Sequence, residues 1–123
     1  MSGRRIDIVE VGARDGLQNE KTVLDVGQKL ALIGRLEAAG VRRQEVVSFV
    51  NPARVPQMAG AEEIMASLPH DAARSRIARL LNMRVWDRCV AGQCDEANVV
   101  VCASDGFGCR NQGASVAEQI AAM

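Results

Sequence analysis

Residues 9–21, VEVGARDGLQNEK, place an arginine and an aspartate directly after a short apolar strand pattern. Gly12 and Gly16 flank the pair and permit a tight turn. In parallel α/β barrels, functional side chains gather at the carboxyl ends of the strands and in the loops that follow them. At such a position Asp15 can ligate a hard divalent cation, and Arg14 can hold a carbonyl or enolate oxygen. For a tripeptide as short as RDG, a solvated turn is the alternative.

Strand patterns and helix patterns alternate along the rest of the chain. Short apolar or period-two runs predict strands, and a spacing of three to four residues predicts helices. The expected strands are 6–11, 41–50, 76–82 and 97–103, and the expected helices are 25–39, 61–68, 84–92 and 114–123. Asp25 and Gly40 are the expected caps of the first helix. Residues 106–113 are expected to form a loop.

This alternation predicts an α/β fold in which helices cover a parallel sheet. A (β/α)8 barrel takes about 250 residues, so four strand–helix units in 123 residues amount to about half of one. An open doubly wound sheet is the other parallel arrangement, but no G-x-G-x-x-G follows the first strand. We therefore expect residues 1–123 to form a single partial domain, the N-terminal (βα)4 half of a TIM barrel.

The second predicted strand supplies a partner for the arginine. By alternation, four of its side chains share one face: Arg43, Glu45, Val47 and Phe49. A carboxylate in the middle of a strand needs a partner. Arg14, at the neighbouring strand end, would keep Glu45 ionised and would itself be held in place. A plain pair with Arg43, or an edge position, is the alternative for Glu45.

The composition is that of a globular protein: 48% of residues are hydrophobic and 24% are charged. The 15 basic residues balance 15 acidic ones, and there are only two phenylalanines, one tryptophan and no tyrosine. We therefore expect neither nucleic acid nor an anionic membrane as a partner. The first residues carry no apolar or amphipathic leader, and no run of about 18 apolar residues occurs. These features predict a cytoplasmic chain.

The cysteines and the single histidine do not predict a metal site. Cys89 and Cys94 are separated by four residues, and Cys102 and Cys109 by six, rather than by the two of a zinc knuckle. We expect unpaired thiols, with Cys102 as a small core residue. His70 is expected to lie in a surface turn.

Two long motifs, 9–21 (VEVGARDGLQNEK) and 45–58 (EVVSFVNPARVPQM), resemble the 3-hydroxy-3-methylglutaryl-CoA lyases. Those enzymes belong to a metal-dependent lyase and synthase superfamily named for an Asp-Arg-Glu set on a TIM barrel, and the set falls here on Asp15, Arg14 and Glu45. The similarity runs from about residue 6 to the end and includes 99–112 (VVVCASDGFGCRNQ). The LQNE that follows RDG favours the lyase branch over the condensing synthases, which tend to read RDGEQ.

The resemblance implies roles for five residues. Asp15 would bind a Mg²⁺ or Mn²⁺ ion that also chelates oxygens of a hydroxyacyl-CoA substrate. Arg14 would stabilise the acetyl-CoA enolate that is expelled in a retro-Claisen cleavage leaving acetoacetate, and Glu45 would hold Arg14. Gln18 and Ser48 are candidates for substrate contacts.

Other parts of the family's site have no counterpart in this sequence. The family takes further metal ligands from a His-x-His pair and an asparagine, and a catalytic cysteine from a later glycine-rich loop. We therefore expect this chain alone to bind Mg²⁺ or Mn²⁺ weakly and to show little or no lyase activity without a second half. Ala13, Gln44 and Val85 also depart from the family pattern, which bears on the packing of strands two and three.

A second hypothesis is a non-catalytic role as an assembly partner or degenerate fragment. Half a barrel exposes the unpaired edges of its first and fourth strands, and such apolar edges invite association. We therefore expect a homo-oligomer, or association with a complementary barrel half.

Overall fold

The computed structural model describes residues 3–123 and contains one sheet of four parallel strands in the order β1-β2-β3-β4. The strands are β1 (Val9–Glu10), β2 (Arg43–Ser48), β3 (Ser75–Leu80) and β4 (Glu96–Val99). The helices are α1 (Val26–Ala38), α2 (Ala61–Ser67), α3 (Trp86–Ala91), α4 (Asp105–Gln112) and α5 (Val116–Ala121), and short helical turns occur at Gly12–Gly16, Pro56–Met58 and Met83–Val85. The predicted alternation of parallel strands with helices is confirmed.

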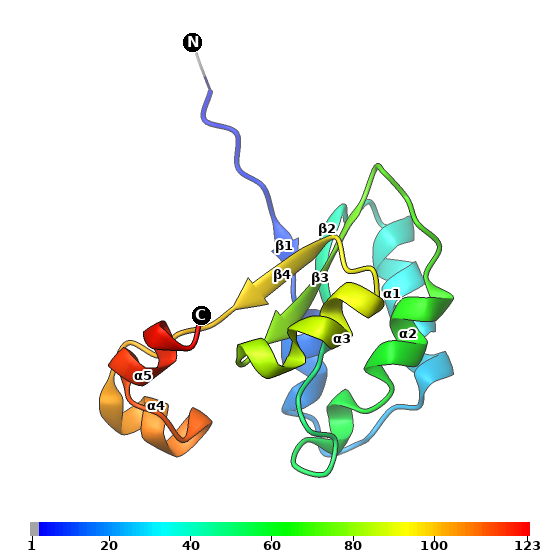
Figure 1. The fold of residues 1–123 in the computed structure, drawn as a ribbon. Coiled ribbons are helices and arrows are strands. Elements are labelled where there is room, and N and C mark those ends of the chain that lie inside the picture. Colours follow the sequence, from blue (N-terminus) through cyan, green and yellow to red (C-terminus); the bar gives the residue numbers. More distant parts are fainter. Residues whose placement is uncertain (1–2) are drawn as a thin grey trace.

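Helices α1, α2 and α3 pack along the sheet, whereas α4 and α5 lie apart from them beyond the carboxyl end of β4 (Figure 1). The core lies between the sheet and the first three helices, and its largest fully buried apolar side chains are Phe49, Ile33, Ile64 and Leu80. Full burial of such a side chain stabilises a fold by about 1.5–3 kcal/mol. The first three strand–helix units therefore form the stable body that positions the carboxyl ends of the strands.

Helix α1 begins and ends where the sequence predicts. The Asp25 carboxylate accepts a hydrogen bond from the Gln28 amide at 2.8 Å, and the Gln28 side chain accepts one from the Asp25 amide at 3.0 Å. This capping box satisfies two backbone donors of the first turn. Gly40 follows the helix with a φ of 97°, a conformation that glycine adopts without strain.

All four strands are shorter than predicted, and at the two edges of the sheet this is because the neighbouring strand ends. Val9 pairs with Arg43, so residues 6–8 would have to pair with 40–42, which form the turn after α1. Ile6 and Ile8 consequently lie exposed. At the other edge Val99 pairs with Leu80, the last residue of β3, so residues 100–103 have no strand beside them. The predicted strand segments 6–8 and 100–103 were therefore wrong.

The predicted loop at 106–113 is also wrong, because residues 106–112 belong to α4. The Ser104 hydroxyl caps the helix by accepting a hydrogen bond from the Phe107 amide at 3.3 Å. Gly113 ends the helix with a φ of 72°. The glycines of 106–113 made this segment look like a loop, but local capping determines its structure.

As expected, Cys102 is buried, the four thiols are unpaired and His70 is exposed.

A bulge in β2 changes which side chains share a face. Glu45 pairs with Ile77, but the register then shifts, so that Ser48 pairs with Arg79. Because Ile77 and Arg79 point to the same side of β3, Glu45 and Ser48 do so on β2. Val47 and Phe49 instead join the core on the helix side. The prediction that these two share a face with Glu45 was wrong, since simple alternation does not hold across a bulge.

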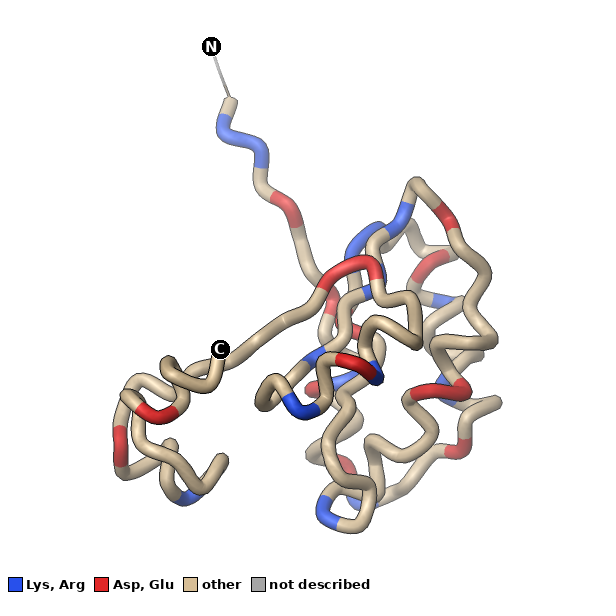
Figure 2. Tube along the Cα trace, viewed as in Figure 1, with Lys and Arg blue, Asp and Glu red and all other residues tan. Residues whose placement is uncertain are grey.

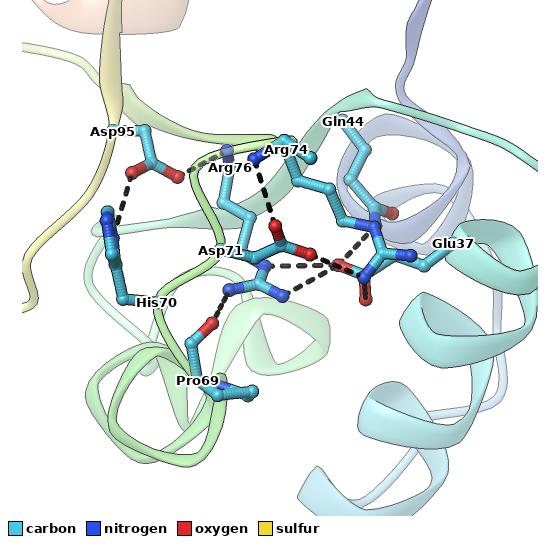
Figure 3. A network of polar contacts seen from close by, with 9 residues as sticks. Glu37, Gln44, Pro69, His70, Asp71, Arg74, Arg76 and Asp95 are labelled. Carbon is cyan, nitrogen blue, oxygen red and sulfur yellow. Dashed lines mark hydrogen bonds and ion pairs between the residues drawn. The ribbon is translucent and has the colours of Figure 1, made fainter.

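The helix side of the sheet also holds a buried polar network (Figure 3). The Arg76 guanidinium, 5% exposed, donates two hydrogen bonds to Glu37 Oε1, at 3.0 and 3.1 Å, and one to the Pro69 carbonyl. Arg74 Nη1 lies 3.4 Å from Glu37 Oε2. Gln44 donates to Glu37 at 3.4 Å, but its own carbonyl oxygen is buried without a partner among residues 3–123. Glu37 is thus the acceptor that joins α1 to β2 and β3.

Figure 2 shows basic and acidic residues interspersed along the trace. Residue Arg43 illustrates the pattern, because its guanidinium forms two hydrogen bonds with Glu96 on β4, at 2.6 and 3.0 Å.

Within residues 3–123, no helix has the length and apolar character that crossing a membrane requires.

Replacing Glu37 with alanine should lower the free energy of unfolding by about 3 kcal/mol, because Arg76 would stay buried without its carboxylate. Urea unfolding followed by circular dichroism measures this change. Glu63→Ala is the matched control, since Glu63 lies exposed on α2, and it should change stability by less than about 0.5 kcal/mol. Equal losses in the two variants would show that the network does not stabilise the fold.

Candidate active site

The site begins at the tight turn Gly12–Gly16, directly after β1. The Val11 carbonyl accepts hydrogen bonds from the amides of Arg14, Asp15 and Gly16, at 3.1, 2.7 and 3.2 Å. The Gly12 amide donates to the Glu10 carboxylate at 2.6 Å, and a Cβ at Gly12 would lie only 2.8 Å from that oxygen. A larger residue at Gly12 would displace the Glu10 carboxylate from this hydrogen bond. The turn directs the next side chains over the carboxyl ends of the strands.

Arg14 is buried against the sheet and forms an ion pair with Glu45, through Nε and Oε1. Their side chains are 6% and 3% exposed. The second oxygen of Glu45 accepts a hydrogen bond from Asn98 on β4 at 2.7 Å. The predicted pairing of Arg14 with Glu45 is confirmed. The alternative of a Glu45–Arg43 pair is wrong, since Arg43 binds Glu96 instead.

Asp15 and Gln18 contact the same guanidinium. Arg14 Nη1 donates to Asp15 Oδ1 at 3.2 Å and to Gln18 Oε1 at 3.3 Å. The Asp15 side chain is 56% exposed, so its carboxylate faces open space beside a buried cation. The Arg14 side chain thus contacts three residues that the sequence predicted for the site: Glu45, Asp15 and Gln18.

Ser48 ends β2 and lies opposite Arg79 in the register of β3. Asn98 lies on the other side of Arg79, on β4. The three residues form a row across the carboxyl edge of the sheet, on the face that carries Glu45. Ser48 is buried, whereas Arg79 is half-buried.

Sequence reasoning missed Arg79 and Asn98. Burial lowers the pKa of the Arg79 guanidinium from its ordinary value, and the positive charge of Arg14 lowers this pKa further. Two signals in the sequence could have found these residues. Arg79 lies within the predicted strand 76–82, and Asn98 interrupts the apolar run 97–103. Polar side chains near a parallel strand's carboxyl end indicate a site.

The described residues offer an incomplete metal site. Across residues 3–123, no three His, Cys, Asp or Glu side chains come together in a way that could hold an ion. Asp15 supplies one exposed carboxylate, and one of its oxygens already accepts a hydrogen bond from Arg14. This donor is of the hard-oxygen type that Mg²⁺ and Mn²⁺ prefer. The described residues could therefore contribute one ligand, the Asp15 carboxylate, to a divalent cation.

A pocket of about 580 Å³ lies away from these residues. It is lined by the N-terminal segment around Ile6 and by residues that precede β2 and β3, including Val41 and Ala73. These residues belong to the amino ends of the strands, opposite to the edge where parallel barrels carry their chemistry. We therefore place the candidate site at the edge around Arg14 rather than in this pocket.

Comparison with known proteins shows which family this chain resembles. The HMGL-like family model matches residues 5–122. The hydroxymethylglutaryl-CoA lyase of Pseudomonas mevalonii is 38% identical over 113 residues, which are 92% of this chain and 38% of that protein. The HMG-CoA lyase structure from Brucella melitensis superposes with a TM-score of 0.91 at 38% identity, over 98% of this chain and 42% of that one.

A structure from Acinetobacter baumannii, described as an HMG-CoA lyase in complex with coenzyme A and 3-methylmalate, has a TM-score of 0.89 at 29% identity. It covers 94% of this chain and 38% of that one. The chain thus spans about two-fifths of the length of these relatives, in the N-terminal part of their TIM barrels. The family match extends over almost the whole sequence, and the chain belongs to the HMGL-like family.

Proposed function

We propose that the chain is the N-terminal barrel half of a carbon–carbon lyase that cleaves 3-hydroxy-3-methylglutaryl-CoA or a close hydroxyacyl-CoA. The observation that carries the proposal is the buried Arg14–Glu45 pair beside the exposed carboxylate of Asp15. The relatives named hydroxymethylglutaryl-CoA lyase, and the one bound to coenzyme A, support this substrate class. Residues 1–123 would then be one partial domain that needs a second half for activity.

The reaction requires stabilisation of a negative charge that appears on an oxygen. The tertiary hydroxyl of the substrate loses its proton to a base, its C–O bond becomes the carbonyl of acetoacetate, and the neighbouring C–C bond breaks. The electron pair of that bond enters the thioester as the enolate of acetyl-CoA, which is then protonated on carbon. A preorganised cation placed at the enolate oxygen lowers this barrier.

Arg14 is the residue that we assign to the enolate oxygen. Its Nε binds Glu45 and its Nη1 binds Asp15 and Gln18, which leaves Nη2 without a partner among residues 3–123. Glu45 is fixed in turn by Asn98, so that the guanidinium is positioned before substrate arrives. Gln18 and Ser48 would contact the substrate from the turn and from the end of β2.

Asp15 is the residue that we assign to the divalent cation. Enzymes of this family are metal-dependent in general. A bound Mg²⁺ or Mn²⁺ would supply Lewis-acid polarisation of substrate oxygens. Because a single carboxylate leaves most of the ion's water ligands in place, this chain alone would bind the cation weakly.

A second candidate is a non-catalytic assembly role, and the sheet edges favour it. β1 and β4 are the edge strands, and each edge carries apolar side chains that are at least 36% exposed, including Val9 and Val99. Unpaired parallel edges of this kind bind another strand. The partner would be a complementary barrel half or a second copy of the chain.

Completing the barrel should produce lyase activity. The chain would be fused to the part of the Pseudomonas mevalonii lyase that follows the matched segment, and assayed with 3-hydroxy-3-methylglutaryl-CoA and Mn²⁺. Arg14→Gln in this fusion should lower kcat about 10²- to 10³-fold, because a charge donor at the developing oxyanion is lost.

Arg35→Gln is the matched control, since Arg35 is exposed on α1, and it should leave kcat unchanged. Thermal melting would show whether each fusion is folded. A folded fusion with no turnover would contradict the proposed lyase function, and an unchanged rate in Arg14→Gln would contradict the role of Arg14.

The isolated chain should bind Mn²⁺ only at about millimolar concentration, through Asp15. Line broadening of backbone amides by Mn²⁺ locates the ion, and the effect should centre on the turn after β1. It should disappear in Asp15→Asn and persist in Asp87→Asn, because Asp87 is exposed on α3. Tight stoichiometric binding in titration calorimetry would show that further ligands exist, with Glu10 and Glu45 the first to test.

The chain without its complement should form dimers or larger assemblies at micromolar concentration, as measured by sedimentation velocity. Val99→Lys should weaken this association, because a charge on an edge strand opposes strand addition. Val90→Lys, on the exposed side of α3, is the control and should not change it. A wild-type monomer with a cooperative melt would rule out edge-driven assembly.

A further inference from the structure

Arg79 is a half-buried guanidinium at the carboxyl edge of the sheet that the proposed mechanism does not use. It lies between Ser48 on β2 and Asn98 on β4, on the face that carries Glu45. Within residues 3–123, no carboxylate forms an ion pair with it and no acceptor receives a hydrogen bond from its side chain. The other buried or half-buried arginines of β2 and β3 differ, since Arg43 binds Glu96 and Arg76 binds Glu37.

The acids nearest to Arg79 are already committed to other donors. Glu45 gives one oxygen to Arg14 and the other to Asn98. Asp15 accepts from Arg14 through one oxygen and extends toward solvent. Arg79 therefore stays a free cation that points over the same edge as Arg14.

The nearby acids compensate the half-buried charge of Arg79 only in part. Burial and the charge of Arg14 lower the pKa of the Arg79 guanidinium, and the charges of Glu45 and Asp15 offset this only in part. The charged form of Arg79 is therefore less well stabilised than that of a surface arginine. An anion that enters the site would restore this interaction. A carboxylate matches the guanidinium fork in a two-point hydrogen bond.

We propose that Arg79 is a specificity-determining residue that binds a free carboxylate on the acyl part of the substrate. The inference rests on the proposed function and narrows its substrate class to hydroxyacyl-CoA thioesters whose acyl chain ends in a carboxylate. The two guanidinium groups then have separate tasks: Arg14 holds the oxygen on the thioester side, and Arg79 holds the opposite end of the acyl chain. Together they fix the direction in which the acyl group lies across β1, β2 and β3.

The test uses the 123-residue chain and two probes, 3-hydroxy-3-methylglutarate and its monomethyl ester. The ester removes one carboxylate and stands in for the thioester end. Affinities come from NMR titration, with the Nε–Hε signals of the arginine side chains as reporters. In the wild-type chain the diacid should shift the Arg79 signal. Its affinity for the wild-type chain should be about 10-fold or more higher than for a variant that lacks the guanidinium.

Arg79→Leu should weaken diacid binding by about 10-fold or more, while Arg79→Lys should retain only part of it, because the charge remains but the two-point hydrogen bond is lost. Arg35→Leu, which removes an exposed arginine from α1, should have no effect. Arg79→Gln keeps a polar side chain of similar length and replaces the leucine variant if that variant does not show a cooperative melt. A diacid affinity that is equal in the wild-type chain and in the folded Leu or Gln variant would overturn the proposal.

The fusion with the remainder of the Pseudomonas mevalonii lyase separates this inference from the proposed function. If the fusion cleaves 3-hydroxy-3-methylglutaryl-CoA and Arg79→Gln leaves KM and kcat unchanged, the assignment of Arg79 is wrong and the lyase function stands. If the fusion is folded but inactive while diacid binding depends on Arg79, the carboxylate site stands and the lyase function is wrong. A crystal structure of the fusion in which a protein carboxylate binds Arg79 would also overturn the proposal.

Discussion

The ion pair between Arg14 and Glu45 is the interaction on which the site depends. Both side chains are nearly completely buried, and a buried charge whose partner is lost costs several kcal/mol. The pair joins the turn after β1 to the middle of β2, and Asn98 extends it to β4. Three strands of the sheet are thus held in register by one carboxylate, which also leaves the outer edge of the Arg14 guanidinium free to meet a ligand.

The two faces of the sheet have different roles, one in packing and one in the candidate site. Val47 and Phe49 pack on the helix side with α1, α2 and α3, where the apolar area that stabilises the fold is buried. The opposite face is polar over most of its length, with Glu45 in its middle and Ser48 and Arg79 at its carboxyl end. The bulge in β2 makes this division possible, because it brings Ser48 onto the face of Glu45 and sends Val47 into the core.

Much of this arrangement could be predicted from the sequence, for physical reasons that can be named. The period-two and helical patterns predicted the parallel sheet, Asp25 predicted the start of α1, and a carboxylate among valines predicted the partner of Arg14. The bulge could not be predicted, since residues 43–49 fit a regular strand equally well. The strand ends depended on where the neighbouring strand stops, and α4 depended on capping by Ser104. Arg79 was missed because its face became known only with the register of β3.

A double-mutant cycle on Arg14 and Glu45 tests the account most directly. Free energies of unfolding would be measured in urea for Arg14→Met, Glu45→Gln and the double variant, in the 123-residue chain. If the pair holds the carboxyl end of the sheet together, each single variant should lose about 3 kcal/mol, and the double variant should lose at least about 2 kcal/mol less than the sum of the two losses. Additive losses would contradict the account, because they would show that Arg14 and Glu45 stabilise the fold independently of one another.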